Sequence, residues 1–254
     1  MKQSQFYYLL RRGLFSAGSA IIKNGLVMFN KFTTAGLNFP AQGSASFDGS
    51  SDYIQLNTPF SYTNHTIAAW VYANDTSVSK EIFNAMDAVD DGIRFFSKPD
   101  EGIRYSVNSS DVNSSATYQD EWVYAVGTYD GTTQKIYING SIDASATTSQ
   151  TISNTTNAKI GARNYSTPAS NFNGNLANVA IWNRALSSDE INSVMWKSYE
   201  GLEGAESNGL QAWYSLDDIS SPAASLANME QLATDKNATI ENKAAVTAAI
   251  NALS

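Results

Sequence analysis

The chain of 254 residues contains no cysteine and only one histidine, His65. Without cysteine it can form no disulfide framework, no thiolate-ligated metal site and no thiol nucleophile. A single histidine likewise excludes a zinc site built from several imidazoles. Charged residues make up only 16% of the chain, so Asn, Ser and Thr supply much of its polar surface. The hydrophobic fraction of 43% is sufficient for a packed core.

Positive charge is scarce and unevenly distributed. Residues 1–47 contain five basic residues and no acidic one, so the net charge of −8 leaves −13 for the remainder. An acidic body argues against nucleic-acid binding, because phosphate contacts need a basic surface. The basic N-terminal segment is typical of a tail that has its own partner. No hydrophobic run reaches the length of a membrane-spanning helix. The apolar stretch after Arg11-Arg12 is short and interrupted, which makes a twin-arginine export signal the less favoured interpretation.

From about residue 44 the sequence consists of short apolar segments separated by turn residues. Within the segments, apolar and polar residues alternate at the spacing of a β-strand. The expected strands are 44–47, 52–57, 66–72, 80–86, 92–98, 101–107, 122–129, 135–138, 158–162, 175–182 and 210–216, with an exposed strand and loop over 145–156. Regular short strands between Gly, Asn and Asp turns favour an all-β sandwich over βαβ units.

The stretch YDGTTQKIYING, residues 129–140, shows this turn chemistry most clearly. Asp130-Gly131 and Asn139-Gly140 are dipeptides that tolerate a positive φ, so each can reverse an antiparallel strand. The segment between them alternates, and residues 122–129 before them have strand propensity. We therefore expect a β-hairpin whose second arm is followed by another reversal.

Helical signals appear only after Trp182. Ser187 and Glu190 have the spacing of a capping box, which predicts a helix that begins at this point. Residues 242–253 place their apolar side chains on one helical face and predict a short amphipathic helix. The domain organisation that we expect is an N-terminal arm over 1–43, a β-sandwich over 44–200, and a C-terminal strand and helix extension over 201–254.

Several segments carry the motifs of one family, in that family's order. They read FDG at 47–49, TIAAWV at 66–71, WVYAVGTYDG at 122–131, YING at 137–140, FNGNL at 172–176 and VAIWNRALS at 179–187. Over residues 44–200 the chain resembles the laminin G-like branch of the concanavalin A-like lectin/glucanase superfamily. The resemblance implies a jelly-roll β-sandwich. Residues 1–43 and 220–254 carry no such motif.

Some relatives in that superfamily are glycanases, so a catalytic site is the first possibility. A glycanase needs two carboxylates about 5–9 Å apart on one cleft, which on a strand requires acidic residues at i and i+2 or i+4. No expected strand has this pattern, and the acidic cluster Asp87, Asp90 and Asp91 falls in a turn. His65 has no Ser/Asp arrangement nearby and is expected simply to begin a strand. We therefore expect no enzyme.

Calcium and sugar are the ligands that the resemblance implies. Asp48, Asp52, Asp130 and Asn139 are candidate calcium ligands, because carboxylate and amide oxygens suit a hard cation. The alternative interpretation is stronger for each residue, since Asp or Asn before Gly is first of all a turn residue. A sugar site needs an exposed aromatic side chain flanked by amides or carboxylates. Tyr165 in the loop 164–167 and the stretch 106–118 offer that chemistry.

Two functions compete on this sequence. The first is a non-catalytic structural or adhesion protein of a larger assembly, most plausibly on a virion or phage surface. Its arm would dock onto another subunit through the apolar runs 6–10 and 26–29, or would pack on its own domain. The second is a secreted or cell-surface lectin that binds glycans, with calcium as a possible cofactor.

Three tryptophans are predicted to fill the core. Trp70, Trp122 and Trp182 lie on the most apolar strands, so we expect them to be buried between the two sheets. On that prediction, replacing Trp122 with Ala costs about 3–5 kcal/mol of stability.

Overall fold

The structure is a computed structural model, and it describes residues 44–56, 60–86, 92–99, 102–150, 152, 158–163 and 170–216. All of them belong to one of the chain's two units, residues 40–254. The arm 1–43, the helix expected over 242–253 and Tyr165 lie outside the described residues. Among the described residues, no helix is both long and apolar enough to cross a membrane.

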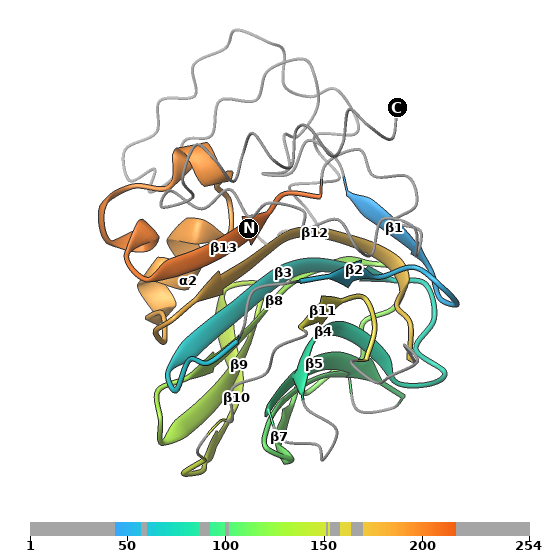
Figure 1. The fold of residues 1–254 in the computed structure, drawn as a ribbon, viewed down its shortest axis with the longest axis horizontal. Helices are drawn as coiled ribbons and strands as arrows, with labels where there is room; N and C mark the ends of the chain where they lie inside the picture. Colours follow the sequence, from blue (N-terminus) through green and yellow to red (C-terminus); the bar gives the residue numbers. More distant parts are fainter. Residues whose placement is uncertain are drawn as a thin grey trace, which may run out of the picture. The chain divides into compact units, whose positions relative to one another are not determined.

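Two antiparallel sheets form a sandwich, as the resemblance implies (Figure 1). The seven-stranded sheet has the order β1-β12-β3-β8-β9-β10, and β13 also pairs with β12. Its strands are β1 (Ala45–Asp48), β3 (His65–Ala73), β8 (Trp122–Tyr129), β9 (Thr133–Ile138), β10 (Ser141–Thr147), β12 (Asn173–Trp182) and β13 (Leu210–Tyr214). The six-stranded sheet has the order β2-β11-β4-β5-β6-β7. Its strands are β2 (Ile54–Gln55), β4 (Lys80–Met86), β5 (Gly92–Lys98), β6 (Gly102–Val107), β7 (Ser110–Asn113) and β11 (Lys159–Ile160).

The core between the sheets follows from strand alternation. One continuous row of cross-strand neighbours runs through the six-stranded sheet: Ile54, Ile160, Phe83, Phe95, Tyr105 and Val112. Every member of this row is buried in the hydrophobic core. Because side chains on a strand alternate between faces, the residues next to this row point away from the core, except Ile82, which is also in the core. Those residues form the opposite face of the same sheet.

The stretch 129–140, with its two predicted turns, folds as predicted. Asn139 and Gly140 have φ values of 51° and 81° and join β9 to β10, while Gly131 has a φ of 93° between β8 and β9. Positive φ at both central residues is what a tight two-residue hairpin turn requires. The expected strand over 145–156 is placed too late, however. β10 begins at Ser141, directly after the turn, because it pairs with β9 from its first residue.

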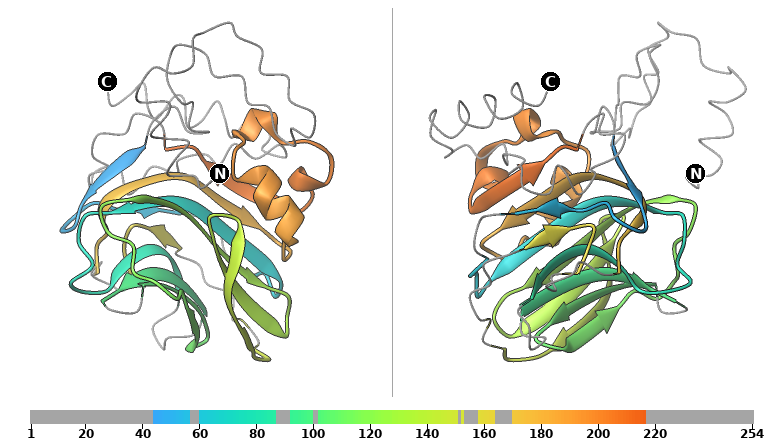
Figure 2. Two further views of the ribbon diagram at one scale, coloured as in Figure 1. Left: turned by 180° about the vertical axis from the view of Figure 1, so that it is seen from behind. Right: turned by 45° about the vertical axis from the view of Figure 1, so that its right-hand side comes forward.

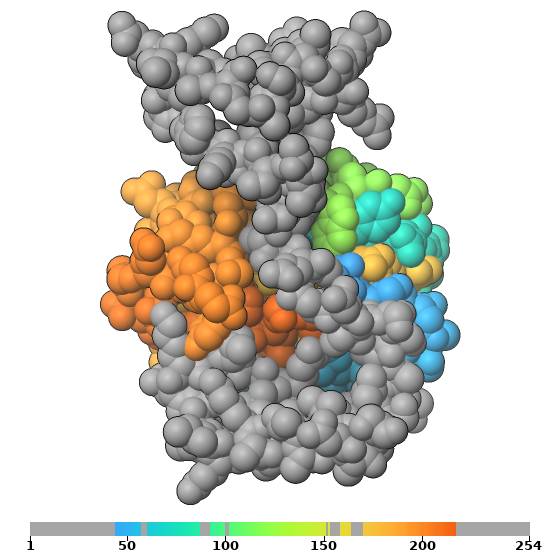
Figure 3. All heavy atoms as spheres, turned by 90° about the horizontal axis from the view of Figure 1, so that it is seen from above, coloured from blue at the N-terminus to red at the C-terminus, as the bar shows by residue number. Residues whose placement is uncertain are grey.

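The capping signal at Ser187 is also confirmed. Helix α2 spans Ser188–Val194, and the Ser187 and Glu190 side chains each bond the backbone N–H of the other. Two single-turn helices follow, η1 (Tyr199–Gly201) and η2 (Gly204–Ser207), before β13 joins the edge of the seven-stranded sheet. The helices α2, η1 and η2 lie against the outer side of that sheet (Figure 2). Seen from above, they form one block of the surface (Figure 3).

The prediction for the tryptophans is wrong in its placement. Ile67, Ala69 and Val71 belong to the core between the sheets, so Trp70 on the same strand points to the outer side. Trp70 and Trp182 are 4% and 0% exposed because the chain after β12 covers them. Their indole N–H groups donate to the carbonyl oxygens of Met195 and Glu206. Trp122 is only half-buried, beside Tyr72, so its removal costs less than a core tryptophan.

Candidate functional site

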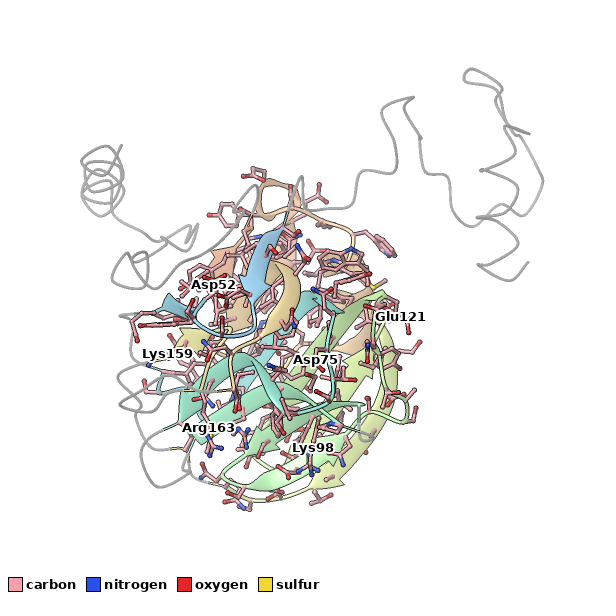
Figure 4. All side chains as sticks on the ribbon, turned by 90° about the vertical axis from the view of Figure 1, so that its right-hand side faces the viewer. Asp52, Asp75, Lys98, Glu121, Lys159 and Arg163 are labelled. Atoms are coloured by element: carbon pink, nitrogen blue, oxygen red, sulfur yellow. The ribbon has the colours of Figure 1, made fainter. Side chains whose placement is uncertain are left out.

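The outer face of the six-stranded sheet carries an unbroken polar row. Six residues are cross-strand neighbours from one edge of the sheet to the other: Gln55, Lys159, Asn84, Arg94, Ser106 and Asp111. A second row beside it contains Glu81, Phe96, Arg104 and Asn113. We call these ten residues the polar face. Lys159 lies on this side of the sandwich, together with Lys98 and Arg163 (Figure 4).

A β-bulge in β4 gives the polar face its buried acid. The pairing of β4 with β5 shifts between Glu81 and Phe83, so β4 contains one extra residue there. Ile82 and Phe83 are therefore both in the core, although they are adjacent in sequence. The shift brings Glu81 onto the same face as Asn84, whose side-chain N–H donates to Glu81 Oε2 over 3.2 Å.

Glu81 and Arg94 form a buried ion pair on this face. Arg94 Nε and Nη2 donate to Glu81 Oε1 over 3.1 and 2.5 Å. The Glu81 side chain is 0% exposed and that of Arg94 is 17% exposed. Burial raises the pKa of Glu81, and the charge of Arg94 acts against this rise. Because a buried charge is costly unless it is paired, the two side chains hold each other in fixed positions.

Two guanidinium groups approach the Phe96 ring. The Arg94 guanidinium carbon is 3.8 Å from the centre of the Phe96 ring, and that of Arg104 is 5.7 Å from it. Arg104 Nη1 in turn donates to Asp111 Oδ2 over 2.5 Å. Stacking on an aromatic ring restricts a guanidinium to one plane, so this part of the face is pre-organised.

Lys159 on β11 lies in the same row, between Asn84 on β4 and Gln55 on β2. It is largely buried, and burial lowers the pKa of its ammonium group. Its Nζ atom lies 5.8 Å from the centre of the Tyr53 ring. The polar face thus combines three cationic side chains, two carboxylates, three amides, a hydroxyl and an aromatic ring. Five of these ten residues are buried: Glu81, Asn84, Phe96, Ser106 and Lys159. Clusters of perturbed titratable groups are typical of functional sites.

The sequence analysis identified only the part of the polar face that lies in the candidate stretch 106–118, namely Ser106, Asp111 and Asn113, and missed the rest. A signal for it exists, because Gly92-Ile93-Arg94-Phe95 and Gly102-Ile103-Arg104-Tyr105 repeat one pattern with arginine at the same strand position. Because side chains alternate along a strand, each arginine points to the face away from the core isoleucine and aromatic residue on either side of it. A search for charged residues inside apolar strands, rather than in turns, would have found both.

Asp48 and Asp52 lie together, but their oxygens serve the turn after β1. Asp48 Oδ1 accepts the backbone N–H groups of Ser50, Ser51 and Asp52. Asp48 Oδ2 accepts the two serine hydroxyls, and Asp52 Oδ2 accepts the N–H of Asp48. The hydrogen bond from the N–H of Ser51 is the main reason that the pKa of Asp48 lies well below its usual value.

Asp130 and Asn139 stand at opposite ends of β9 and do not meet the other pair. Asp130 Oδ1 accepts the N–H groups of Thr132 and Thr133, and Asn139 Oδ1 accepts that of Tyr124. Each is therefore a turn residue in this structure. Within the described residues, no three histidine or acidic side chains come together as a metal site would require. Calcium binding at Asp48, Asp52, Asp130 or Asn139 stays a prediction.

His65 begins β3, as expected, and lies in the interior. Its Nδ1–H donates to the carbonyl oxygen of Tyr62 over 3.2 Å, and its Nε2 accepts the hydroxyl of Tyr105. Burial lowers the pKa of His65 to about 3, so the imidazole is neutral at physiological pH. The ring packs against Phe60 and Tyr129, which gives His65 the surroundings of a core residue.

The comparisons with known proteins agree with this architecture. A laminin G-type family model, described as the concanavalin A-like lectin/glucanases superfamily, matches residues 48–192, more than half of the chain. The chain belongs to this superfamily. A search of curated proteins found no match to it.

Two solved structures show the same fold. One is a Bacteroides ovatus protein assigned as carbohydrate-binding, with a TM-score of 0.55 and 18% identity over 69% of this chain. The match covers 51% of that protein, so this chain spans about half of its length. The other is the heptameric SAP-like pentraxin of Limulus polyphemus, with a TM-score of 0.51 and 17% identity, covering 60% of this chain and 81% of the pentraxin. At these identities the likeness concerns the fold.

Proposed function

We propose that this protein is a non-catalytic carbohydrate-binding protein and that it binds its glycan on the polar face. The observation that carries the proposal is the cation–π cluster of Arg94, Phe96 and Arg104 beside amide and hydroxyl side chains of the same face. Sugars are bound by planar side chains and by several hydrogen-bonding groups in fixed positions. On the polar face the planar groups are the guanidinium groups of Arg94 and Arg104, since Phe96 itself is only 3% exposed. The chain belongs to the lectin/glucanase superfamily, which includes sugar-binding proteins.

The state of the two carboxylates supports a binding role over a catalytic one. A glycoside hydrolase needs one carboxyl group free to give up a proton and a second free to act as base or nucleophile. On the polar face, Glu81 is held by Arg94 and Asp111 is held by Arg104. Neither carboxylate is positioned for proton transfer, and each instead fixes an arginine.

A glycan array tests this function directly. The wild-type protein is expected to bind a restricted set of glycans, and Arg104→Gln is expected to weaken that binding. Lys135→Gln is the matched control, because it removes one positive charge from β9 of the other sheet. Repeating the array with added calcium and with a chelator shows whether the binding needs calcium. If the wild-type protein binds no glycan under either condition, the carbohydrate-binding function is wrong.

The second candidate function that we propose is display on a larger assembly, a virion surface, with an extracellular or cell-surface location as the alternative. It is favoured by the charge contrast between residues 1–47 and the rest of the chain. A basic segment attached to an acidic domain suits docking onto an acidic neighbouring subunit. Deleting residues 1–24 is expected to leave a folded domain that no longer joins its assembly. Normal assembly of the truncated protein would refute this anchoring function.

A further inference from the structure

Arg94 has one edge of its guanidinium group occupied and the other edge available. Its Nε and Nη2 atoms bond a single oxygen, Glu81 Oε1, along the side of the group. Within the described residues, no acceptor bonds Nη1, and every interaction of Arg94 is accounted for by Glu81 and Phe96. The side chain is 17% exposed. The end of the group, formed by Nη1 and the second Nη2 hydrogen, therefore remains for a ligand.

That open edge is held in place before any ligand arrives. The fully buried Glu81 carboxylate fixes the side of the guanidinium, and the Phe96 ring lies 3.8 Å from its central carbon. A guanidinium presents two parallel N–H groups that match the two oxygens of a carboxylate or sulfate. Fixing it beforehand reduces the conformational entropy that binding would otherwise cost.

The surroundings of Arg94 are cationic as well. Arg104 flanks the same phenylalanine ring, and Lys159 is separated from Arg94 only by Asn84 in the cross-strand row. The one acid that touches Arg94, Glu81, is itself fully buried. An anion placed at the open edge would therefore have two further cations on the same face, Lys159 and Arg104, the second of which is paired with Asp111.

We propose that Arg94 binds the carboxylate or sulfate group of an acidic glycan. This inference rests on the proposed carbohydrate-binding function and specifies the class of sugar. Glu81 is the positioning residue, which orients the guanidinium, and Phe96 supports its plane. A neutral sugar would leave the open edge of Arg94 without a charged partner.

The test compares ligands that differ only in charge. Oligogalacturonate and its methyl ester share one backbone, and heparin oligosaccharides and their desulfated form provide the same contrast for sulfate. Affinities are measured by calorimetry on the full chain. We expect at least one acidic form to bind roughly 10- to 100-fold more tightly than its neutral counterpart, as the loss of a charged hydrogen-bonded pair implies. Which pair shows the difference identifies the anion.

Two variants assign the effect to Arg94. Arg94→Lys keeps the charge but removes the paired N–H groups, so the preference for the acidic form is expected to fall toward unity. The double variant Glu81→Gln/Arg94→Gln removes both charges together, because removing one partner alone would leave an unpaired buried charge. It is expected to stay folded by circular dichroism and to lose the same preference. Lys135→Gln, the control on the other sheet, is expected to keep it.

The outcomes separate this inference from the proposed function. Equal affinity for the acidic and neutral forms, or an acidic preference that survives in Arg94→Lys and in the double variant, overturns the role of Arg94 while carbohydrate binding stands. If neither form of any glycan binds the wild-type protein, the proposed function fails and this inference fails with it.

Discussion

His65 makes the stability of the domain depend on pH in a window where few other groups titrate. The imidazole is buried between the sheets, and its hydrogen bonds to Tyr62 and Tyr105 suit the neutral form. Burial lowers its pKa to about 3, whereas an unfolded histidine titrates near pH 6.5. Below pH 6.5 the unfolded chain therefore binds a proton that the folded chain excludes. Acidification from pH 6.5 toward pH 3 must then favour unfolding.

The size of the effect follows from the linkage between proton binding and stability. One histidine that is protonated only in the unfolded state lowers the free energy of unfolding by about 1.4 kcal/mol per pH unit. Between pH 7 and pH 5 the loss is roughly 2 kcal/mol, a large part of the 5–15 kcal/mol typical of a domain. Asp48 and Glu190, whose pKa values are lowered, lose their contributions only below about pH 4.5. Glu81, whose pKa is raised, acts in the opposite direction.

The measurement is urea denaturation at pH 7, 6 and 5, on the wild type and on the double variant His65→Phe/Tyr105→Phe. Replacing both hydrogen-bonded partners leaves no unpaired buried hydroxyl, and the phenyl ring fits among Phe60 and Tyr129. The variant is expected to lack the histidine part of the slope. Because His65 is the only histidine, its proton NMR signal can be assigned without ambiguity. A folded-state titration near pH 6.5, or equal slopes for the two proteins, would refute the reasoning.

Three further expectations concern packing and capping. Gly127→Ala should destabilise the domain by about 1–3 kcal/mol, because the new Cβ would lie 2.5 Å from the Tyr105 ring. The control Gly201→Ala, whose Cβ would have no atom closer than 3.7 Å, should leave the thermal unfolding temperature unchanged. Trp182→Ala should cost about 3–5 kcal/mol, and the half-buried Trp122→Ala clearly less; equal losses would contradict the partial burial of Trp122. Ser187→Ala should cost about 0.5–2 kcal/mol through loss of the helix cap, and Ser187→Asp, which restores the acceptor, should recover most of it.

The strands were predictable because alternation and turn residues act locally. The segments 80–86, 92–98 and 122–129 coincide with β4, β5 and β8, since each is bounded by turn residues and is rich in strand-forming residues. The capping box at Ser187 is equally local, and it begins α2 as expected. What failed was the choice of side for Trp70. β3 is apolar on both faces, so its alternation cannot show which face meets the second sheet and which meets the chain after β12.

The polar face was not predictable in the same way, because acidic residues in the turns conceal the positive charge of the arginines inside the strands. Around β4 and β5, five acidic residues fall in 87–91 and 100–101, between the strands, while Glu81, Arg94 and Arg104 stand inside strands. The net charge of −8 averages over both groups and hides a cationic face. The contact between Arg94 and Glu81 joins residues 13 apart through sheet pairing. Only the register shows that they meet.

The single extra residue in β4 connects the core to the polar face. In a regular strand, Glu81 would share a face with Phe83 and Ala85, both of which lie in the core. A carboxylate there would lack Arg94 and would carry the cost of an unpaired buried charge. The shift in pairing between Glu81 and Phe83 moves Glu81 to the outer face and still buries Ile82 and Phe83. Bulges next to binding sites turn side chains to the other face in this way, and they interrupt the regular hydrogen bonding between the two strands. The orientation of Arg94, and with it any preference for an acidic ligand, therefore depends on a backbone irregularity that the residue types alone do not reveal.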